Sequence, residues 1–415
     1  MPQGVNAQTL AYQYEKVLPR ISELMQRDHT LWDHIEKRNV ETQSSRAMRI
    51  PLDILSGGKP AQWNPDGGDA GRGAAIVADY AQLSPVFFTN ATEFTKLAEV
   101  ATDGKEKAVD SVAKRNLEKA VDQIRKFFET LLNTDGSGTL DTVVSVSSNI
   151  LTVNNANQFQ DQQDIQIFSA LGGVNRGTAT VQSVDANGKQ LYLTLAAPVG
   201  TAANDLIICA GAPGVAASSL LGLLYHQVDS NTGTWLNLAR SSYPGKLKTP
   251  HVAMNNFAIT PAAIRLGIGL LKRALGVDNP NVDDLVFHLD IDQDAAWENL
   301  AIVPSSVIMN QLGGNASQDM LKKNTPETIA GRKKIVSINA KPGRIDGLCL
   351  KHWGRGEIQP TGPLEFGGQT LFPVYGGSGG LSGTTISYLW GGFNFFTDNP
   401  RAGIFFDSAA VPAGY

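Results

Sequence analysis

The sequence has few cysteines and little net charge. Only two of its 415 residues are cysteines, Cys209 and Cys349, too few for a disulfide framework or a cysteine-based zinc site. We therefore expect a reducing compartment. Lysines and arginines number 35 against 39 aspartates and glutamates, which gives a formal net charge of −4. A near-neutral chain is not expected to bind nucleic acid through overall charge, or a membrane through a polybasic surface.

Long apolar runs are also missing. No run approaches the roughly 18 consecutive apolar residues that indicate a transmembrane helix. The first residues, MPQGVNAQTLAYQYEK, lack the basic and then apolar pattern of a secretory signal. What remains is rich in glycine, with 42 glycines and 20 prolines. We expect a soluble intracellular chain of mixed α and β structure and about two to three domains, without a membrane partner.

The first hundred residues combine a helical pattern with two strand-like runs. Apolar residues at three- to four-residue spacing between residues 8 and 26 predict an amphipathic helix. RAMRIPLDI (46–54) and AAIVADYAQLSPVFFTNATEF (74–94) read as strands around the glycine- and proline-rich segment 56–73. This arrangement predicts a hairpin with a long irregular tip. Because a two-stranded ribbon is unstable alone in water, it must lie on its own body or on a neighbouring subunit.

Three further segments have clear patterns. Apolar residues at helical spacing predict one long helix over 104–132 with a single buried face. Six short alternating stretches in 143–210 predict a small β barrel or sandwich, followed by the linker-like GAPGVAAS. In the remainder, Thr260 and Gly276 have the positions of the N-cap and the stop of a helix. Strands are expected at 285–291, 334–338, 347–351 and 385–396.

Three motifs are weak candidates for chemistry. Ser378 lies in GGSGG, which formally matches a hydrolase nucleophile elbow, but the last histidine, His352, precedes it in the chain. The cluster of His288, Asp290, Asp292 and Asp294 lacks the glycine and glutamate of a calcium-binding EF-hand loop and reads better as a strand end followed by a helix. We therefore expect no catalytic residue, no metal and no cofactor.

A second EF-hand-like spacing follows the long helix. It comprises Asn133, Asp135, Ser137, Gly138 and Asp141. Its twelfth position is Val144 in place of the bidentate glutamate, and no exit helix is expected after it. A helix end followed by a glycine-containing turn explains the same residues.

The order of these segments resembles a known family. RAMRIPLDI, WNPDGGDAGRG and SPVFFTNATEFTKLAEVATD, followed by NTGTWLNLARSSYP, TLFPVYGGSGG, FNFFTDNPRAG and AVPAGY, are similar to blocks of tailed-bacteriophage major capsid proteins with the HK97-like fold. The resemblance implies an α+β fold with an N-terminal arm, an extended β-hairpin loop, a spine helix, and peripheral and axial domains. The implied divisions are 1–45 for the arm, 46–95 for the extended loop, 96–142 for the spine helix and start of the peripheral domain, 143–211 for a small inserted all-β domain, and 212–415 for the axial domain and the remaining peripheral domain.

The resemblance also implies a function without catalysis. Copies of the chain would assemble as hexamers and pentamers into an icosahedral shell around double-stranded DNA, bound without sequence specificity. The shell would form in the host cytoplasm and become the virion capsid, with portal, scaffolding or decoration proteins as further partners. The tip of the extended loop would contact a neighbouring subunit through Asn64, Pro65, Asp66, Gly67, Gly68 and Asp69. Some relatives crosslink a lysine to an asparagine between subunits, for which Lys59, Asn394 and Asn399 are present.

Two other classes of function remain open at this point. An encapsulin-like compartment shell, or another structural protein of the virion, would share the same architecture. A calcium-dependent hydrolase would use Ser378 or the cluster around Asp290.

Overall fold

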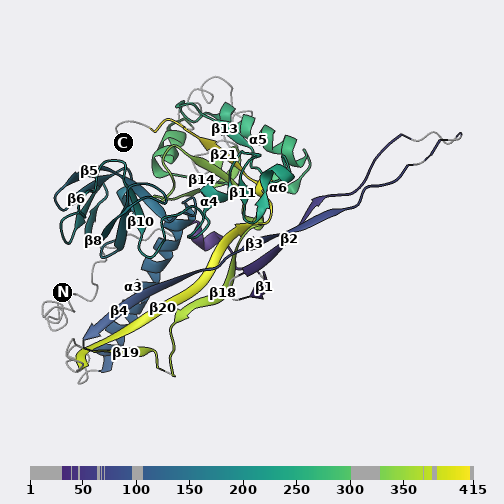
Figure 1. The fold of residues 1–415 in the computed structure, drawn as a ribbon. Coiled ribbons are helices and arrows are strands. Elements are labelled where there is room, and N and C mark those ends of the chain that lie inside the picture. Colours follow the sequence, from purple (N-terminus) through teal and green to yellow (C-terminus); the bar gives the residue numbers. More distant parts are fainter. Residues whose placement is uncertain are drawn as a thin grey trace.

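The structure is a computed structural model, and it divides into a rounded body, a barrel beside it, a long sheet with a helix along it, and a projecting ribbon (Figure 1). It describes residues 30–38, 40–44, 47–62, 66, 68–69, 71–95, 106–300, 328–367, 369–375 and 381–411. The amphipathic helix expected within residues 8–26 lies outside these ranges. Within them, no helix is both long and apolar enough to cross a membrane.

The predicted hairpin is present as the projecting ribbon, by which we mean β2 (Ala47–Leu55), β3 (Val77–Leu83) and the residues between them. β2 and β3 pair antiparallel from Met48 opposite Leu83 to Leu55 opposite Val77. A short strand, β1 (Glu41–Ser44), pairs with the other edge of β2, from Glu41 opposite Arg49 to Ser44 opposite Ala47. Pro51 is tolerated in β2 because it lies beyond the last β1 pair, where no strand needs its missing N–H.

The expectation of one strand across residues 74–94 is wrong. Ser84 and Pro85 separate β3 from β4 (Val86–Thr95), and β4 belongs to another sheet. There it pairs antiparallel with the 17-residue strand β20 (Leu381–Thr397) from Val86 opposite Phe393 to Thr95 opposite Thr384. The proline restricts the residue before it and donates no N–H, so the strand is interrupted here and the chain passes from one sheet to the other.

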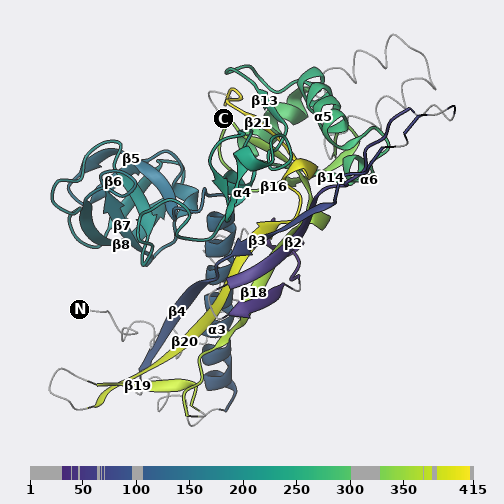
Figure 2. The ribbon, with the colours of Figure 1, turned by 45° about the vertical axis from the view of Figure 1, so that its right-hand side comes forward.

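We call this second sheet the peripheral sheet. It contains β4, β20, β18 (Trp353–Pro363) and β19 (Leu371–Tyr375). The predicted long helix is α3 (Glu106–Leu132), which runs alongside the sheet (Figures 1 and 2) and is about 40 Å long at ~1.5 Å per residue. Phe128 of α3 lies edge-on to Phe393 of β20 at 4.7 Å between ring centroids, so an aromatic contact fastens the helix to the sheet.

The six predicted short strands are confirmed, and they close into a barrel. Alternate side chains point inward, among them Leu151, Ile165, Val181 and Ile207, all fully buried. The barrel strands are β5 (Thr139–Ser147), β6 (Ile150–Val153), β7 (Asp164–Phe168), β8 (Asn175–Asp185), β9 (Gln190–Leu193) and β10 (Leu206–Cys209).

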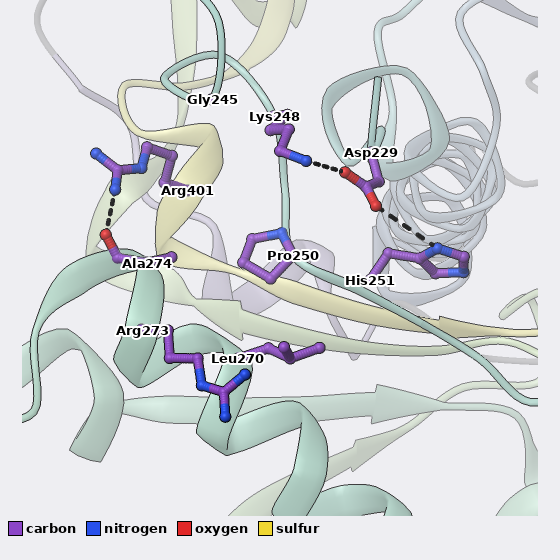
Figure 3. Close-up of a pocket in the computed structure, with 9 residues that line it drawn as sticks. All are labelled: Asp229, Gly245, Lys248, Pro250, His251, Leu270, Arg273, Ala274 and Arg401. Atoms are coloured by element: carbon purple, nitrogen blue, oxygen red, sulfur yellow. Dashed lines mark hydrogen bonds and ion pairs between the residues drawn. The ribbon is translucent and has the colours of Figure 1, made fainter. Parts of the chain in front are cut away.

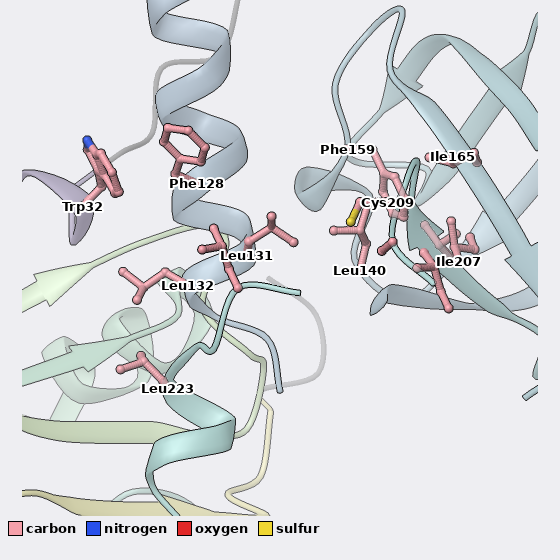
Figure 4. Packing of buried hydrophobic residues seen from close by; sticks show 14 of the residues in the cluster. Trp32, Phe128, Leu131, Leu132, Leu140, Phe159, Ile165, Ile207, Cys209 and Leu223 are labelled. Carbon is pink, nitrogen blue, oxygen red and sulfur yellow. The ribbon is translucent and has the colours of Figure 1, made fainter. Parts of the chain in front are cut away.

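Hydrogen bonds and a shared apolar cluster hold the barrel in place relative to α3; Figure 4 shows some of the buried side chains of this cluster. Lys126 Nζ of α3 donates to the Phe159 carbonyl at 3.3 Å, and Gln160 Nε2 donates to the Gln123 carbonyl at 3.0 Å. One continuous apolar cluster includes Phe128 of the helix and Phe159 and Ile165 of the barrel region. The barrel therefore has a fixed position relative to α3.

The rounded body is built on a six-stranded mixed sheet. Its order is β13 (His251–Ala253), β21 (Ile404–Asp407), β17 (Ile345–Cys349), β14 (Leu285–Leu289), β16 (Arg332–Val336) and β15 (Thr328–Ile329). Helix α5 (Pro261–Leu275) packs on it, and Gly267 lies so close to Phe406 that a Cβ would approach that ring to 2.4 Å. The predicted helix ends are confirmed, because the Thr260 side chain accepts from the Ala263 N–H and Gly276 has φ 106°.

Short elements connect these parts. They are the 3₁₀ turns at Trp32–His34, Ala156–Gln158, Arg240–Ser242, Leu350–His352 and Pro400–Ala402, the helices α4 (Leu223–His226) and α6 (Pro280–Asp283), and the two-stranded hairpin of β11 (Thr234–Trp235) and β12 (Leu238–Ala239). A further helix follows β14 from residue 291.

Candidate assembly surfaces

The projecting ribbon exposes apolar side chains that it has no means of burying. Ile76 is 69% exposed, and Leu55 and Tyr80 are also exposed. Such side chains gain free energy when they are transferred from water to a protein surface, at about 25 cal/mol per Å² buried. Because the ribbon extends away from its own body, that surface has to come from another molecule (Figure 1).

The tip of the ribbon is described only in part. Asp66, Gly68 and Asp69 lie in the described ranges, and Asp69 Oδ1 accepts from the Gly71 N–H at 3.1 Å. Asn64, Pro65 and Gly67 lie outside them. Where the tip begins, Gly57 has φ 68°, and a Cβ there would lie 2.6 Å from the backbone nitrogen of Ile76. Glycine is therefore required at position 57 for the two arms of the ribbon to approach each other.

The segment before the ribbon is anchored to the spine helix. Glu129 of α3 is fully buried, and its two carboxylate oxygens accept from the backbone N–H groups of Leu31 and Trp32, at 3.4 and 2.7 Å. Its Oε1 also accepts from Ser337 Oγ at 3.1 Å. The Trp32 ring packs against Phe128, with 4.9 Å between ring centroids. One carboxylate therefore connects the start of the described chain to both α3 and the six-stranded sheet.

The same segment continues onto β18. Arg38 donates its backbone N–H to the Arg355 carbonyl at 3.1 Å, and Lys37 forms an ion pair with Glu357 at 3.0 Å. The Arg38 guanidinium pairs with Asp398 at 2.7 Å. Residues 30–38 are thus fixed in place, which makes them a base for the residues that precede them.

The peripheral sheet has exposed aromatic rings. Phe87 of β4 is 53% exposed and its ring lies against Gly392, where a Cβ would come within 2.5 Å of the ring. Tyr375 of β19 and Phe366, which lies between β18 and β19, are still more exposed. Aromatic side chains are favoured in the buried centres of protein interfaces, so this sheet is a second candidate contact surface.

The acidic cluster after β14 is the start of a helix, as the sequence predicts. Burial, and then the nearby carboxylate of Asp292, raise the pKa of Asp290 to about 6. Asp294 forms an ion pair with Lys334. Among the described residues, no group of three or more histidine, cysteine or acidic side chains is arranged to hold a metal ion. Ser378, the other residue considered for hydrolysis, lies outside the described residues.

The carboxylates in and after the turn that follows α3 accept hydrogen bonds from nearby backbone N–H groups. Asp135 Oδ1 accepts from the Ser137 N–H at 3.0 Å, and Asp141 Oδ2 accepts from the Asn155 N–H at 2.6 Å. These contacts stabilise the entry into the barrel. They explain the EF-hand-like spacing without a calcium ion.

A pocket of about 380 Å³ lies between the end of α5 and the start of β13 (Figure 3). Lys248 and Asp229 form an ion pair across it at 2.8 Å, and Arg401 donates to the Ala274 carbonyl. Its lining contains no serine, threonine or cysteine beside His251, so a histidine-activated nucleophile is not formed there. In the view of Figure 3, the guanidinium groups of Arg273 and Arg401 point to different sides of the pocket.

The asparagines considered for a crosslink are both in use. Asn394 is only 2% exposed; its Oδ1 accepts from the Leu221 N–H at 2.9 Å and its Nδ2 donates to the Ser84 carbonyl at 2.7 Å. Asn399 caps the turn at Pro400–Ala402 by accepting from the Arg401 N–H. Lys59 is exposed on the ribbon. Asn394 is therefore a structural residue in this fold.

Comparison with solved structures identifies the architecture. The chain is similar to the cyanophage A-1(L) capsid chain, with a TM-score of 0.56 at 12% identity, over 95% of this chain and 96% of that one. The chain has the HK97-like capsid fold. Chains of an empty GTA particle capsid (TM-score 0.49, 9% identity, 94% and 100% covered) and of the Myoviridae phage XM1 capsid (TM-score 0.47, 9% identity, 98% and 99% covered) are also similar. No protein-family model and no curated protein matches the sequence.

The HK97-like capsid fold can be compared with the expectations drawn from the sequence. The α+β class predicted from the sequence agrees with it, and the similarity covers nearly the whole length of both chains. Sequence reasoning missed two features, the pairing of β4 with β20 and the anchoring of residues 31 and 32 on Glu129. The position of Glu129 between Phe128 and Leu131 was the one available signal, because it places a carboxylate among buried apolar neighbours.

Proposed function

We propose that this chain is the major capsid protein of a tailed phage, which assembles as hexamers and pentamers into an icosahedral shell around double-stranded DNA. The observation that carries the proposal is the similarity of nearly the whole chain to the cyanophage capsid chain. The projecting ribbon supports it, because a ribbon with exposed apolar residues and no body beneath it needs a partner to lie on.

Within this proposal, each part of the chain has a role in assembly. Residues before 46 form the N-terminal arm, and α3 is the spine. The extended loop is assigned to residues 46–95; within it the ribbon covers 47–83, and β4 joins the peripheral sheet. Its tip, residues 64–69, contacts a neighbouring copy. The six-stranded sheet with α5 is the axial domain.

The barrel is proposed as an inserted domain. It starts in the turn after α3 and returns through residues 211–218 to α4, so its two ends meet at the same place on the spine. Such an insertion leaves the remaining fold intact. The bonds from Lys126 and Gln160 hold the barrel still, which suits a reinforcing or displayed module better than a moving one.

In this proposal the protein acts by binding to other copies of itself and by enclosing DNA, without catalysis. A formal charge of −4 allows an inner surface to lie near DNA without strong nonspecific binding. Portal, scaffolding or decoration proteins are the further partners we propose. No enzymatic step is part of the proposal.

The test is to purify the protein and determine its mass by size-exclusion chromatography with light scattering, with electron microscopy of the largest species. Megadalton particles or rings of capsomer size are expected. A variant lacking residues 57–73 should remain soluble and fail to close shells. Normal shells from that variant would contradict the role given to the ribbon.

The cargo separates the phage capsid from a compartment shell. Particles isolated from the producing cell should contain double-stranded DNA when the phage packaging proteins are present. Particles that instead hold a protein cargo and exclude nucleic acid would favour an encapsulin-like compartment.

A further inference from the structure

The outer edge of β3 is capped by the side chain of Asn237. Its Oδ1 accepts from the Gln82 N–H at 2.6 Å, and its Nδ2 donates to the Tyr80 carbonyl at 3.2 Å. The N–H of residue 82 and the C=O of residue 80 lie on the same edge of a strand. One amide therefore takes the place that a neighbouring strand would occupy.

Asn237 is presented by a strained turn. It follows Leu236, which joins β11 to β12 and has φ 54°, an uncommon conformation for a residue other than glycine. The Leu236 N–H is held by the Tyr225 hydroxyl at 2.8 Å. The neighbouring Trp235 is fully buried, which ties the turn to the body. The surrounding structure thus maintains a costly backbone conformation at the position that aims Asn237 at β3.

A second contact reaches β3 from the same segment. The Tyr243 hydroxyl donates to Asp79 Oδ2 at 2.8 Å, and Asp79 Oδ1 accepts from the Tyr80 N–H at 2.8 Å. Three polar backbone groups on the outer edge of β3, in Tyr80 and Gln82, are therefore bonded to side chains.

From this geometry we propose that Asn237 is a positioning residue that fixes the angle at which the ribbon leaves the body and blocks strand pairing at the base of β3. The inference rests on the proposed function, because it treats the ribbon as the arm that reaches a neighbouring copy. A second copy then meets the ribbon only from Val77 outwards. An arm held at one angle reaches the neighbouring copy in a defined position.

The clamp can be tested in the isolated subunit, independently of assembly. Asn237 is exposed, so Asn237→Ala removes the amide without emptying the core. Hydrogen exchange followed by mass spectrometry should show faster exchange in the peptide containing Gln82, by roughly two- to tenfold, as expected for the loss of one partly exposed hydrogen bond. Asn237→Asp keeps the acceptor for Gln82 and should restore most of the protection at that amide.

Asn231→Ala is the matched control. It removes an exposed asparagine from the same segment, whose Oδ1 accepts from the Gly245 N–H and does not contact β3. It should leave exchange at Gln82 unchanged. Unaltered exchange in Asn237→Ala, or the same increase in Asn231→Ala, would overturn the clamp.

Assembly is the second readout and separates the two proposals. If the wild-type protein forms shells, Asn237→Ala should yield fewer closed shells and more misshapen ones, while Asn231→Ala matches the wild type. If Asn237→Ala forms shells equal to the wild type in yield and shape, the positioning role is wrong even when exchange at Gln82 is faster. If the wild type forms no shell under any condition, the proposed function fails, and the exchange result still decides whether the clamp exists.

Discussion

The indole Nε1 of Trp235 donates a hydrogen bond to Nδ1 of His226 at 3.1 Å, deep in the protein. Since Nδ1 accepts, the ring proton is on Nε2, which donates to the Phe395 carbonyl at 3.2 Å. The ring is therefore neutral, and protonating it would break its bond with Trp235. His226 therefore connects the β11–β12 turn, which carries Asn237, to the end of β20 in the peripheral sheet.

Acid should destabilise the protein through His226. Burial lowers the pKa of His226 to about 3 from an ordinary value of 6.5. Below pH 6.5 the unfolded chain takes up a proton that the folded chain does not, so stability falls as pH is lowered towards 3, by up to about 1.4 kcal/mol per pH unit. Denaturant unfolding of the wild type and of His226→Gln across this range measures the effect. A wild-type slope no steeper than that of the variant would show that His226 is not the group responsible.

Asp290 should act in the opposite direction. Its pKa is raised to about 6 from 3.8, mainly by burial. Between these values the folded protein holds more protons, so this carboxyl favours folding at low pH and its contribution is lost as pH rises through 6. Asp290→Asn should therefore stabilise the protein at pH 7, by an amount on the order of 2 kcal/mol, and have little effect at pH 3.5. A larger gain at pH 3.5 than at pH 7 would reverse the assigned sign.

Two phenylalanines should separate folding from assembly. Phe128 is 1% exposed between α3 and β20, and Phe128→Ala should cost about 3–5 kcal/mol of unfolding free energy. Phe87 is half exposed on β4. Phe87→Ala should change the unfolding free energy by less than about 1 kcal/mol and reduce particle yield. Thermal unfolding and electron microscopy of both variants provide the comparison, and full particle yield from Phe87→Ala would remove this ring from the interface.

Removing the Glu129 carboxylate should release the arm. Glu129→Ala leaves the backbone N–H groups of Leu31 and Trp32 without this acceptor, at a cost of roughly 2 kcal/mol or more. Limited proteolysis should then cleave near residue 30 and beyond it, while Glu129→Gln, which keeps one acceptor oxygen, should be cut more slowly. Identical cleavage of both variants and the wild type would mean that other contacts, such as Arg38 with Asp398, suffice.

The sequence predicts those parts of this fold that depend on residue patterns within short segments. The caps of α5 at Thr260 and Gly276, the long helix α3 and the six barrel strands all follow from patterns within short windows. The partner of β4 does not, because an alternating pattern fits any sheet and β20 lies nearly 300 residues away.

The side-chain contacts to the backbone were equally beyond prediction. Asn237 binds the backbone of Tyr80 and Gln82, and Glu129 binds the backbone of Leu31 and Trp32. Every residue offers such backbone groups, so residue types alone do not mark where these bonds form. The contact of residues 64–69 with a neighbouring subunit, inferred from the glycine-rich sequence of the tip, remains a prediction.

Gly57 and Gly58 provide the sharpest test of the ribbon. An alanine at 57 would have to adopt φ 68° with its Cβ 2.6 Å from the Ile76 nitrogen, so Gly57→Ala must push apart the two arms of the ribbon. At 58 a Cβ meets nothing within 4 Å and φ is ordinary, so Gly58→Ala should have no effect on the ribbon.

Neither position lies in the core, and both variants should keep the wild-type melting temperature. Shell assembly should fail or slow in Gly57→Ala alone, as followed by light scattering. Equal assembly of both variants would show that the shape of the ribbon at this point does not matter to the contact, because the two substitutions differ only in the backbone strain and close approach at residue 57.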